Sequence, residues 1–491
     1  MLSDLLTKGY FPSELPPCFN TASYAHAVAS GGAPKEFLSA HESQLCSFSL
    51  ARAGNSRFRR RLSLVNPVNF CELSRLIVNN WTALQAHMKT STLSRSTATY
   101  RPQGERALSP SSYSPGHLVE TRARARGTAK VLLVADISEF YHSIYTHSIS
   151  WALHTKAVAK ANRNGNLLGD KLDSAVRKAQ HGQTIGIPIG PDTSLVIAEV
   201  ILAAVEQEVR HQVPNLEGFR FVDDFELCFP DQATAEKGLA VIQEMLLRFD
   251  LRLNPRKTNL FLPPINLEPE WISELRRFKI RDNSGQKHDL IAYFDTMTRL
   301  LRAYPNEHVS KYGLRRFKSF KPKYFNLQLL QSMLCHIGVA EPGSVREVIE
   351  ALCFLRSQSL PLETLPIQQM LTAVLTTSTP LGHHYESAWA LWAAIHFSIP
   401  LSTEVGKAVC TTENSTVAIL ALDASARGLI TLSDTSRWQA RMTQRDLRED
   451  EWLLSYEANI HSWLPTVGVG DHVASDSAFG FLKSQNVTFY R

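Results

Sequence analysis

The sequence predicts an α+β unit, in which helices cover an antiparallel sheet, followed by an all-α region. Apolar residues alternate with period two on both sides of the pair Asp223-Asp224, which is typical of a β-hairpin. The apolar run at residues 131–135 is typical of a buried strand. From about residue 290 onward the apolar residues recur only with helical spacing, so we expect no further sheet there.

The composition predicts a soluble globular protein of two or three domains. The chain has 491 residues and a formal net charge of +6, which permits contact with nucleic acid without requiring it. Its seven cysteines form no C-x-x-C pair, which argues against a disulfide framework or a zinc finger and fits a reducing cytoplasm. We find no signal peptide and no stretch suited to a membrane span, and therefore expect a cytoplasmic protein without a membrane partner.

The first part of the chain alternates between proline-rich, basic and polar stretches. Residues 1–20 contain too many prolines for regular structure beyond a first helical turn, so we expect an extended arm. Residues 70–88 are typical of a helix, whereas residues 89–118 are rich in Ser, Thr and Pro and predict a mobile or interface loop. Arg122, Arg124 and Arg126 alternate before the next strand and are candidates for binding a nucleic-acid backbone.

The sequence contains three acidic residues whose positions are poorly explained by a purely structural role. Hairpin turns favour Asn-Gly or Asp-Gly, and Asp223-Asp224 serves that geometry badly, although a solvated turn remains an alternative. Asp136 ends the apolar strand, where a lone acid is also typical of a helix cap. Taken together, the three carboxylates form a candidate site for divalent metal ions, which prefer oxygen ligands.

Four stretches in this part of the chain resemble the motifs of reverse transcriptases and occur in the same order. They are a first palm motif at Asp136–Tyr141, a glycine-proline turn at Gly186-Ile187-Pro188-Ile189-Gly190, an aromatic-x-Asp-Asp box at Phe221-Val222-Asp223-Asp224 and a lysine motif at Leu253–Thr258. The resemblance covers roughly residues 50–262. It implies the fingers and palm of a right-hand polymerase, and hence a nucleotidyltransferase that uses deoxynucleoside triphosphates.

The stretch Phe140–Ile149, followed by Trp151, narrows the resemblance to the abortive-infection reverse transcriptases of bacterial phage defence. That resemblance implies untemplated DNA synthesis from a protein hydroxyl, single-stranded DNA left covalently attached, and assembly into homo-oligomers. It also implies a bacterial cytoplasmic location. Many templating reverse transcriptases carry Gln where this chain has Ile189, and the difference argues against ordinary template monitoring.

The resemblance also implies a role for each residue at the acidic site. Asp136 and Asp223 would bind two Mg²⁺ ions, with Mn²⁺ as an alternative, and Asp224 would support them. Lys257 would supply charge or a proton near the pyrophosphate.

The nucleotide-binding residues come from separate stretches. Arg60 and Arg61 would hold the triphosphate, because the planar guanidinium group can bind phosphate oxygens through two hydrogen bonds. Tyr141 would lie beneath the incoming sugar and exclude a 2′-hydroxyl. The turn that includes Gly186, Pro188 and Gly190 would approach the nucleotide, since glycine allows close backbone contact.

A protein primer requires a hydroxyl on a segment that can reach the metal ions. Tyr10, on the expected arm, is the leading candidate, with Tyr100 and Tyr113 as competitors. Packing of the arm is the alternative role for Tyr10.

Two other functions remain open from the sequence. A template-dependent reverse transcriptase that copies a bound RNA would retain the same acids. A non-catalytic sensor of nucleic acid or of a phage protein would act instead through the helical region.

The predicted domains are an N-terminal arm with entry helices at 1–50, reverse-transcriptase-like fingers and palm at 51–285, and a C-terminal α-helical repeat domain, HEAT-like in character, at 286–491. Helical periodicity in the last of these predicts helices at Leu290–Ala303, Asn326–Ile337, Ser344–Arg356, Glu386–Phe397, Ser415–Arg427 and Glu449–Trp463.

Overall fold

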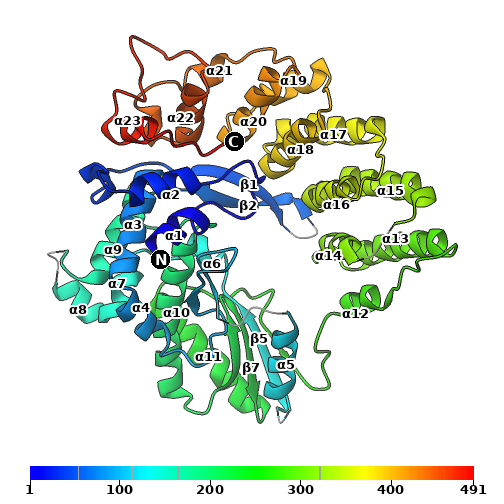
Figure 1. Ribbon diagram of the computed structural model, residues 1–491. Helices are drawn as coiled ribbons and strands as arrows, with labels where there is room; N and C mark the ends of the chain where they lie inside the picture. The colour runs from blue at the N-terminus through cyan, green and yellow to red at the C-terminus, as the bar shows by residue number, and fades with distance from the viewer. Residues whose placement is uncertain (53–54, 112–114, 128, 163–164, 320–321) are drawn as a thin grey trace.

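The structure, a computed structural model, describes every residue except 53–54, 112–114, 128, 163–164 and 320–321. Figure 1 shows a lower lobe that contains the main sheet, a long β-hairpin above it, and a curved stack of helices. The stack starts beside the sheet and ends above the hairpin, close to the N-terminal helices. The fold therefore has the mixed, mostly helical content expected of a reverse-transcriptase-like protein.

The main sheet has four strands in the order β6-β7-β5-β8, and every neighbouring pair is antiparallel. The strands are β5 (Val131–Asp136), β6 (Glu217–Phe221), β7 (Asp224–Phe229) and β8 (Asn259–Phe261). β6 and β7 form the predicted hairpin around the acidic pair, and β5 is the predicted strand that ends in Asp136. The sheet predicted from alternation is thus confirmed.

Helices α10 (Asp192–Gln212) and α11 (Gln232–Arg248) pack together, and α11 covers β5 and β7. Phe229 faces α11, where a Cβ atom on Gly238 would lie 2.6 Å from its ring. Because side chains alternate along a strand, Asp224 and Asp136 lie on the opposite face from Phe229. The other helices of this lobe are α3 (Pro67–Asn79), α4 (Trp81–Met88), α6 (Phe140–Ser143), α7 (Ser148–His154), α8 (Lys156–Ala161) and α9 (Leu168–Lys178).

The arginines at 122, 124 and 126 do not alternate along a strand as predicted, because Pro115–Ala125 forms helix α5. Residues four apart share a face of a helix, so Arg122 and Arg126 reach the same carboxylate on β7. Their guanidinium groups donate to Glu226 over 2.7 and 2.8 Å. These two cations are therefore engaged within the protein.

The polar segment before α5 is partly built into the core. It forms a short hairpin of β3 (Ala98–Tyr100) and β4 (Leu108–Pro110), and Ser94 and Ser96 ahead of it are buried. The prediction of a mobile loop is therefore wrong for Ser94 and Ser96, whose hydroxyl groups both donate to the buried Glu199. Tyr113 lies outside the described residues.

A second, two-stranded sheet forms the long hairpin of Figure 1, from β1 (Cys46–Arg52) and β2 (Asn55–Leu64). In the register Ser49 lies opposite Arg61 and Leu50 lies opposite Arg60. Arg59 and Arg61 consequently lie on one face of the hairpin and Arg60 on the other. The predicted domain boundary after residue 50 falls inside β1.

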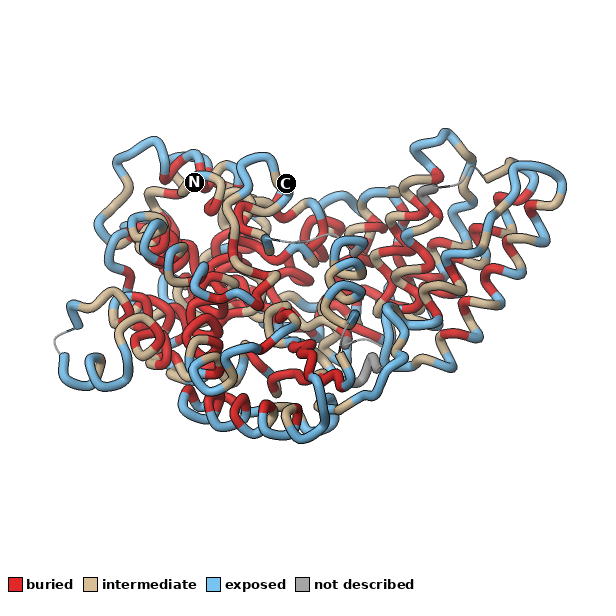
Figure 2. Tube along the Cα trace, turned by 90° about the horizontal axis from the view of Figure 1, so that it is seen from below, coloured by how far each residue is buried: buried red, intermediate tan, exposed pale blue. Residues whose placement is uncertain are grey.

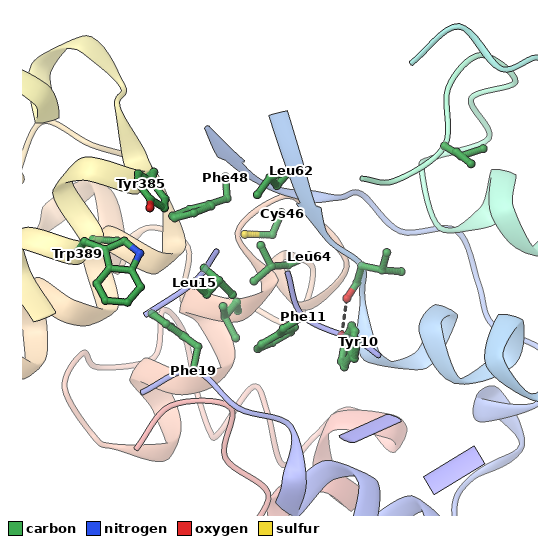
Figure 3. Close-up of a cluster of buried hydrophobic side chains, with 14 of the residues drawn as sticks. Tyr10, Phe11, Leu15, Phe19, Cys46, Phe48, Leu62, Leu64, Tyr385 and Trp389 are labelled. Atoms are coloured by element: carbon green, nitrogen blue, oxygen red, sulfur yellow. Dashed lines mark hydrogen bonds between the residues drawn. The ribbon is translucent and has the colours of Figure 1, made fainter. Parts of the chain in front are cut away.

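The N-terminal segment is a packed part of the core and not an extended arm. It begins with α1 (Leu2–Lys8), continues through a buried run that includes Tyr10 and Phe11, and reaches α2 (Ala22–Ala29) and the short 3₁₀ helix η1 (Lys35–Phe37). Figure 3 shows Tyr10 and Phe11 close to Leu64 of the hairpin, with Leu15 directed toward the side occupied by α18. Burial of these aromatic rings outweighs the irregularity that the prolines impose.

After β8 every regular element in the described residues is helical. The main helices stack in two layers, in which α15 contacts α16 and α17, α18 contacts α16, α17 and α20, and α20 contacts α22. The six predicted helices correspond to α13, α15, α16, α18, α20 and α22. The elements are α12 (Glu270–Arg277), α13 (Gln286–Ala303), α14 (Val309–Arg315), η2 (Arg316–Ser319), η3 (Tyr324–Asn326), α15 (Leu327–Ala340), η4 (Pro342–Ser344), α16 (Val345–Ser357), α17 (Thr364–Ser378), η5 (Thr379–Leu381), α18 (His384–Phe397), α19 (Thr403–Val409), α20 (Ser415–Ala426), α21 (Ser436–Gln439), η6 (Asp446–Arg448), α22 (Trp452–Ile460) and α23 (Ser477–Ser484).

The helical stack and the first lobe share one hydrophobic core. Figure 2 shows buried residues that continue from the first lobe into each helix of the stack. Polar contacts cross the same boundary, since Trp389 donates its indole N–H to the Glu14 carbonyl over 2.8 Å and Asn414 donates to the Ser47 carbonyl over 2.6 Å. No helix in the part of the chain that the structure describes has the length and apolar character of a membrane span.

The strongest of these contacts joins the hairpin to α18. The Arg59 guanidinium group binds both carboxylate oxygens of Glu386 over 2.8 and 2.5 Å, and the Glu386 side chain is fully buried. We predict that Arg59→Ala lowers the free energy of unfolding by about 3 kcal/mol, because it leaves a buried carboxylate without its partner. Denaturant unfolding measures the change.

Two further variants separate the ion pair from general effects on the hairpin. Adding Glu386→Gln to Arg59→Ala should recover part of the loss, since no buried charge remains. Arg61→Ala, on the same face but exposed, should change the stability by less than about 0.5 kcal/mol. Equal losses in Arg59→Ala and Arg61→Ala would contradict this role of the ion pair.

Candidate active site

The register of β5 against β7 brings the acidic residues together. Asp136, the last residue of β5, lies directly opposite Asp224, the first residue of β7. Residues opposite one another in an antiparallel pair have Cβ atoms about 4.5–5.5 Å apart. The carbonyl of Asp223, in the turn before β7, accepts the Ile137 N–H over 3.3 Å. The three predicted acidic residues therefore lie at the same end of the sheet.

The turn between β6 and β7 holds Asp223 in an unusual way. Its residues are Val222 and Asp223, and Val222 has a φ of +51°. This left-handed conformation is rare for a β-branched side chain and carries strain. Such strain persists only where the surroundings fix the backbone.

The loop that follows α11 places a lysine and an asparagine on Asp136. The Lys257 ammonium group donates to Asp136 Oδ2 over 2.7 Å, and the Asn254 side chain donates to Oδ1 over 3.3 Å. The Asn254 backbone N–H also binds the Asp136 carbonyl over 2.7 Å. The predicted lysine motif thus provides the positive charge beside the carboxylates.

The charges of the site shift the proton affinity of its own groups. Burial and the carboxylate of Asp136 raise the pKa of Asp223. Burial and the carboxylates of Asp223 and Asp136 raise the pKa of Asp224 to about 7. Although burial opposes it, the hydrogen bond to Asp136 raises the pKa of Lys257. The mutual repulsion of these carboxylates is thus only partly offset by Lys257 and Arg60.

Arg60 and Arg61, which were predicted to act together, lie in different surroundings. Arg60 lowers the pKa of Asp223 and so lies near the carboxylates. Together with burial, Lys311 and Arg315, it also lowers the pKa of His308, the cap of α14, to about 4. Arg61 instead lies near His384, whose pKa falls to about 4 through burial and the charges of Arg59 and Arg61.

Tyr141 and the glycine-proline turn lie next to each other. The Ile187 N–H donates to the Tyr141 carbonyl over 2.8 Å. Burial, followed by the carboxylates of Asp223 and Glu199, raises the pKa of Tyr141, so its ring is near the acidic site.

The two glycines have positive φ, +88° at Gly186 and +124° at Gly190. A Cβ atom on Gly186 would meet the His142 carbonyl oxygen at 3.2 Å, and one on Gly190 would meet the Pro12 ring at 2.5 Å. Internal packing therefore requires glycine at both positions, in addition to any approach to a nucleotide. Between them, the Pro188 carbonyl accepts the Ser194 hydroxyl at the start of α10.

Tyr10 is not brought to the carboxylates. Its ring is fully buried and stacks on Phe70 with centroids 4.1 Å apart, and its hydroxyl donates to the Val65 carbonyl (Figure 3). Burial raises its pKa well above the usual value of a tyrosine. The expectation of a mobile arm that presents this hydroxyl is wrong, because the aromatic core outweighs the proline-rich character of the segment.

Sequence reasoning missed the residues that support the turn. Arg220 and Glu199 are both fully buried and form an ion pair at 2.9 Å. Glu199 stands within an apolar helical stretch, and an acid in such a position is the signal that a buried cation pairs with it. Ser94 and Ser96 gave no such signal within a polar stretch.

The fold and the site define a polymerase-type nucleotidyltransferase. The family described as reverse transcriptase (RNA-dependent DNA polymerase) matches residues 56–301, about half of the chain. The chain belongs to this family. No curated protein sequence matches the chain.

Among solved structures, two telomerases resemble the chain at low similarity. The telomerase of Candida albicans in complex with a fragment of telomeric RNA is 13% identical with a TM-score of 0.31, and the match covers 70% of this chain and 63% of that one. The apo telomerase of Candida tropicalis is 11% identical with a TM-score of 0.31, over 73% and 61% of the two chains. This chain thus spans less than two thirds of either telomerase.

Reverse transcriptase domains generally use divalent metal ions, and the donor set here suits them. Within the described residues no three acidic, His or Cys side chains converge as a ready-made metal site. The carboxylates of Asp136, Asp223 and Asp224 are nevertheless the hard oxygen donors that Mg²⁺ prefers. Lys257 adds a positive charge beside these donors through its 2.7 Å contact with Asp136.

We predict that Asp224→Asn raises the melting temperature in metal-free buffer at pH 8 by about 1–3 °C. In the folded protein the pKa of Asp224 is about 7, above its unfolded value, so its contribution to stability is complete below pH 4 and is lost as the pH rises through 7. The gain from the variant should therefore shrink toward pH 5. A gain independent of pH would contradict the assignment, and calorimetry at both pH values measures it.

We also predict that Arg60→Ala raises KM for deoxynucleoside triphosphate about tenfold, since a hydrogen bond to a charged group contributes about 1.5–3 kcal/mol. Arg61→Ala is the matched control, because the neighbouring residue lies on the opposite face of β2. It should leave KM within about twofold, the range of ordinary surface changes. Steady-state incorporation assays compare the two variants, and equal effects would place both arginines on the nucleotide.

Proposed function

We propose that this protein is a DNA polymerase of abortive-infection defence against phage, which adds deoxynucleotides without a template and starts from a hydroxyl of the protein. The meeting of Asp136, Asp223 and Asp224 beside Lys257 carries the polymerase chemistry. The stretch Phe140–Ile149 and the presence of Ile189 support the finer assignment.

Each residue of the site has a separate role in the proposed phosphoryl transfer. Two Mg²⁺ ions, when bound by Asp136 and Asp223, supply activation of the hydroxyl and charge for the leaving pyrophosphate. Asp224 supports them, and Arg60 binds the triphosphate from the hairpin. Tyr141 lies beneath the sugar, and Lys257, beside Asp136, supplies charge or a proton to the pyrophosphate.

The distribution of charge supports a nucleic-acid product. Residues 271–325 contain thirteen lysines and arginines but only five aspartates and glutamates, whereas the whole chain has a net charge of +6. The rest of the chain is therefore slightly acidic. The basic segment forms α12, α13 and α14, which Figure 1 shows as the start of the helical stack. A single-stranded DNA product that leaves the site would meet these cations first.

The helical stack is HEAT-like in this proposal, and it supports assembly into homo-oligomers in the bacterial cytoplasm. Its two-layer order of contacts, α15 to α17 and α16 to α18, is the arrangement that stacked repeats produce.

The primer is a hydroxyl on a more accessible segment than Tyr10. Tyr100 is partly exposed, and its hydroxyl donates to Asp4 over 2.5 Å, which raises its pKa. Tyr10 would have to leave an aromatic core before it could attack.

The decisive experiment analyses protein purified from cells by intact mass and nuclease digestion. We expect the purified protein to have a greater mass than the polypeptide alone, and we expect DNase to reduce the excess to a small nucleotide adduct. The Asp223→Ala variant should be folded but free of DNA, because it loses a metal ligand. Peptide mapping should place the adduct on a residue other than Tyr10.

The outcomes separate the alternatives. DNA that appears only after an RNA template is added would favour a template-dependent reverse transcriptase. Protection against phage that survives Asp223→Ala would favour a non-catalytic sensor. An adduct on Tyr10 would show that the N-terminal segment opens during initiation.

A further inference from the structure

The turn that carries Asp223 is held by groups outside the catalytic set. Val222, with its φ of +51°, presents one N–H and one carbonyl, and both have buried partners. The N–H donates to the Ser96 hydroxyl oxygen over 2.7 Å, and the carbonyl accepts from the Arg220 guanidinium group over 2.9 Å. The backbone of the strained residue is therefore fixed on both sides.

One carboxylate holds both of these partners. Glu199 of α10 accepts from the Ser96 hydroxyl over 2.7 Å and from Arg220 over 2.9 and 3.1 Å. Glu199, Ser96 and Arg220 each have no exposed surface. Because a hydrogen bond to a buried charge is stronger than a neutral one, Glu199 fixes the orientation of both groups.

Ser94 provides a comparison within the same cluster. Its hydroxyl donates to the other oxygen of Glu199 over 2.7 Å and accepts the Ser96 backbone N–H over 3.2 Å, whereas the Val222 N–H donates to Ser96 and not to Ser94. Ser94 and Ser96 each donate one hydrogen bond to the buried carboxylate, and of the two serines Ser96 is the one that also binds Val222.

We propose that Ser96 and Arg220 are positioning residues that hold Val222 in its left-handed conformation and so fix the Asp223 carboxylate against Asp136. Without them the residue would relax toward the common extended region, which is lower in energy for valine. Asp223 would move with it, because it follows Val222 directly and its own carbonyl is held by the long, 3.3 Å contact with the Ile137 N–H. This inference rests on the proposed function of the carboxylates.

The test measures Mn²⁺ binding by titration calorimetry, with nucleotide incorporation as a second readout. Arg220 lies between two buried glutamates, so its removal endangers folding, and Ser96→Ala carries the test. We expect Ser96→Ala to weaken Mn²⁺ binding about tenfold, because the Asp223 carboxylate is then no longer held in position by the Val222 backbone. Incorporation should fall through kcat more than through KM for the nucleotide.

Two further variants distinguish positioning from a general loss of stability. Ser94→Ala should lower the melting temperature about as much as Ser96→Ala but leave Mn²⁺ affinity unchanged. Adding Val222→Gly to Ser96→Ala should restore most of the affinity, because glycine adopts positive φ without strain.

Equal Mn²⁺ affinities in the wild type and in Ser96→Ala would overturn the inference, as would equal losses in Ser94→Ala and Ser96→Ala. Failure of the wild-type protein to bind Mn²⁺ or to incorporate nucleotide would instead overturn the proposed function.

Discussion

The antiparallel register between β5 and β7 is the constraint on which the site depends. It sets Asp136 opposite Asp224, and a shift by one residue would turn one of these carboxylates into the helix-covered face. The same register places Phe225, Leu227 and Phe229 toward the helices, so the hydrophobic core enforces the position of the acids. The repulsion among three carboxylates at one end of the sheet is thus offset by apolar packing and is relieved in part by Lys257.

Much of this arrangement could be predicted from local sequence. The alternation around Asp223-Asp224 and the apolar run before Asp136 each encode a strand whose side chains have assigned faces. Four motifs in order then place the glycine-proline turn and Lys257 near those strands. Six helices of the C-terminal stack were also predictable from the helical spacing of their apolar residues, whereas α12, α14, α17, α19, α21 and α23 were not predicted.

The rest depends on partners that are distant in sequence. Ser94 and Ser96 lie in a polar stretch that looks like a loop, and only the buried Glu199, about a hundred residues away, makes them part of the core. The roles of Arg122 and Arg126 could not be assigned without Glu226, the carboxylate on β7 that binds both of them. Tyr10 was misplaced because its proline-rich surroundings conceal the aromatic residues from α3 and the end of the chain that enclose it.

The two ends of the described chain close on each other, and this limits how the molecule can be divided. The Asn20 N–H donates to the Phe489 carbonyl over 3.0 Å, and the Arg491 N–H donates to the Cys18 carbonyl over 3.0 Å. The Phe489 ring also packs on Tyr10, Phe11 and Tyr24. A fragment cut to the polymerase motifs would therefore lose walls of its own interior. The catalytic region is not a portable module, and exchange of the helical stack between relatives would have to carry the N-terminal segment and the hairpin with it.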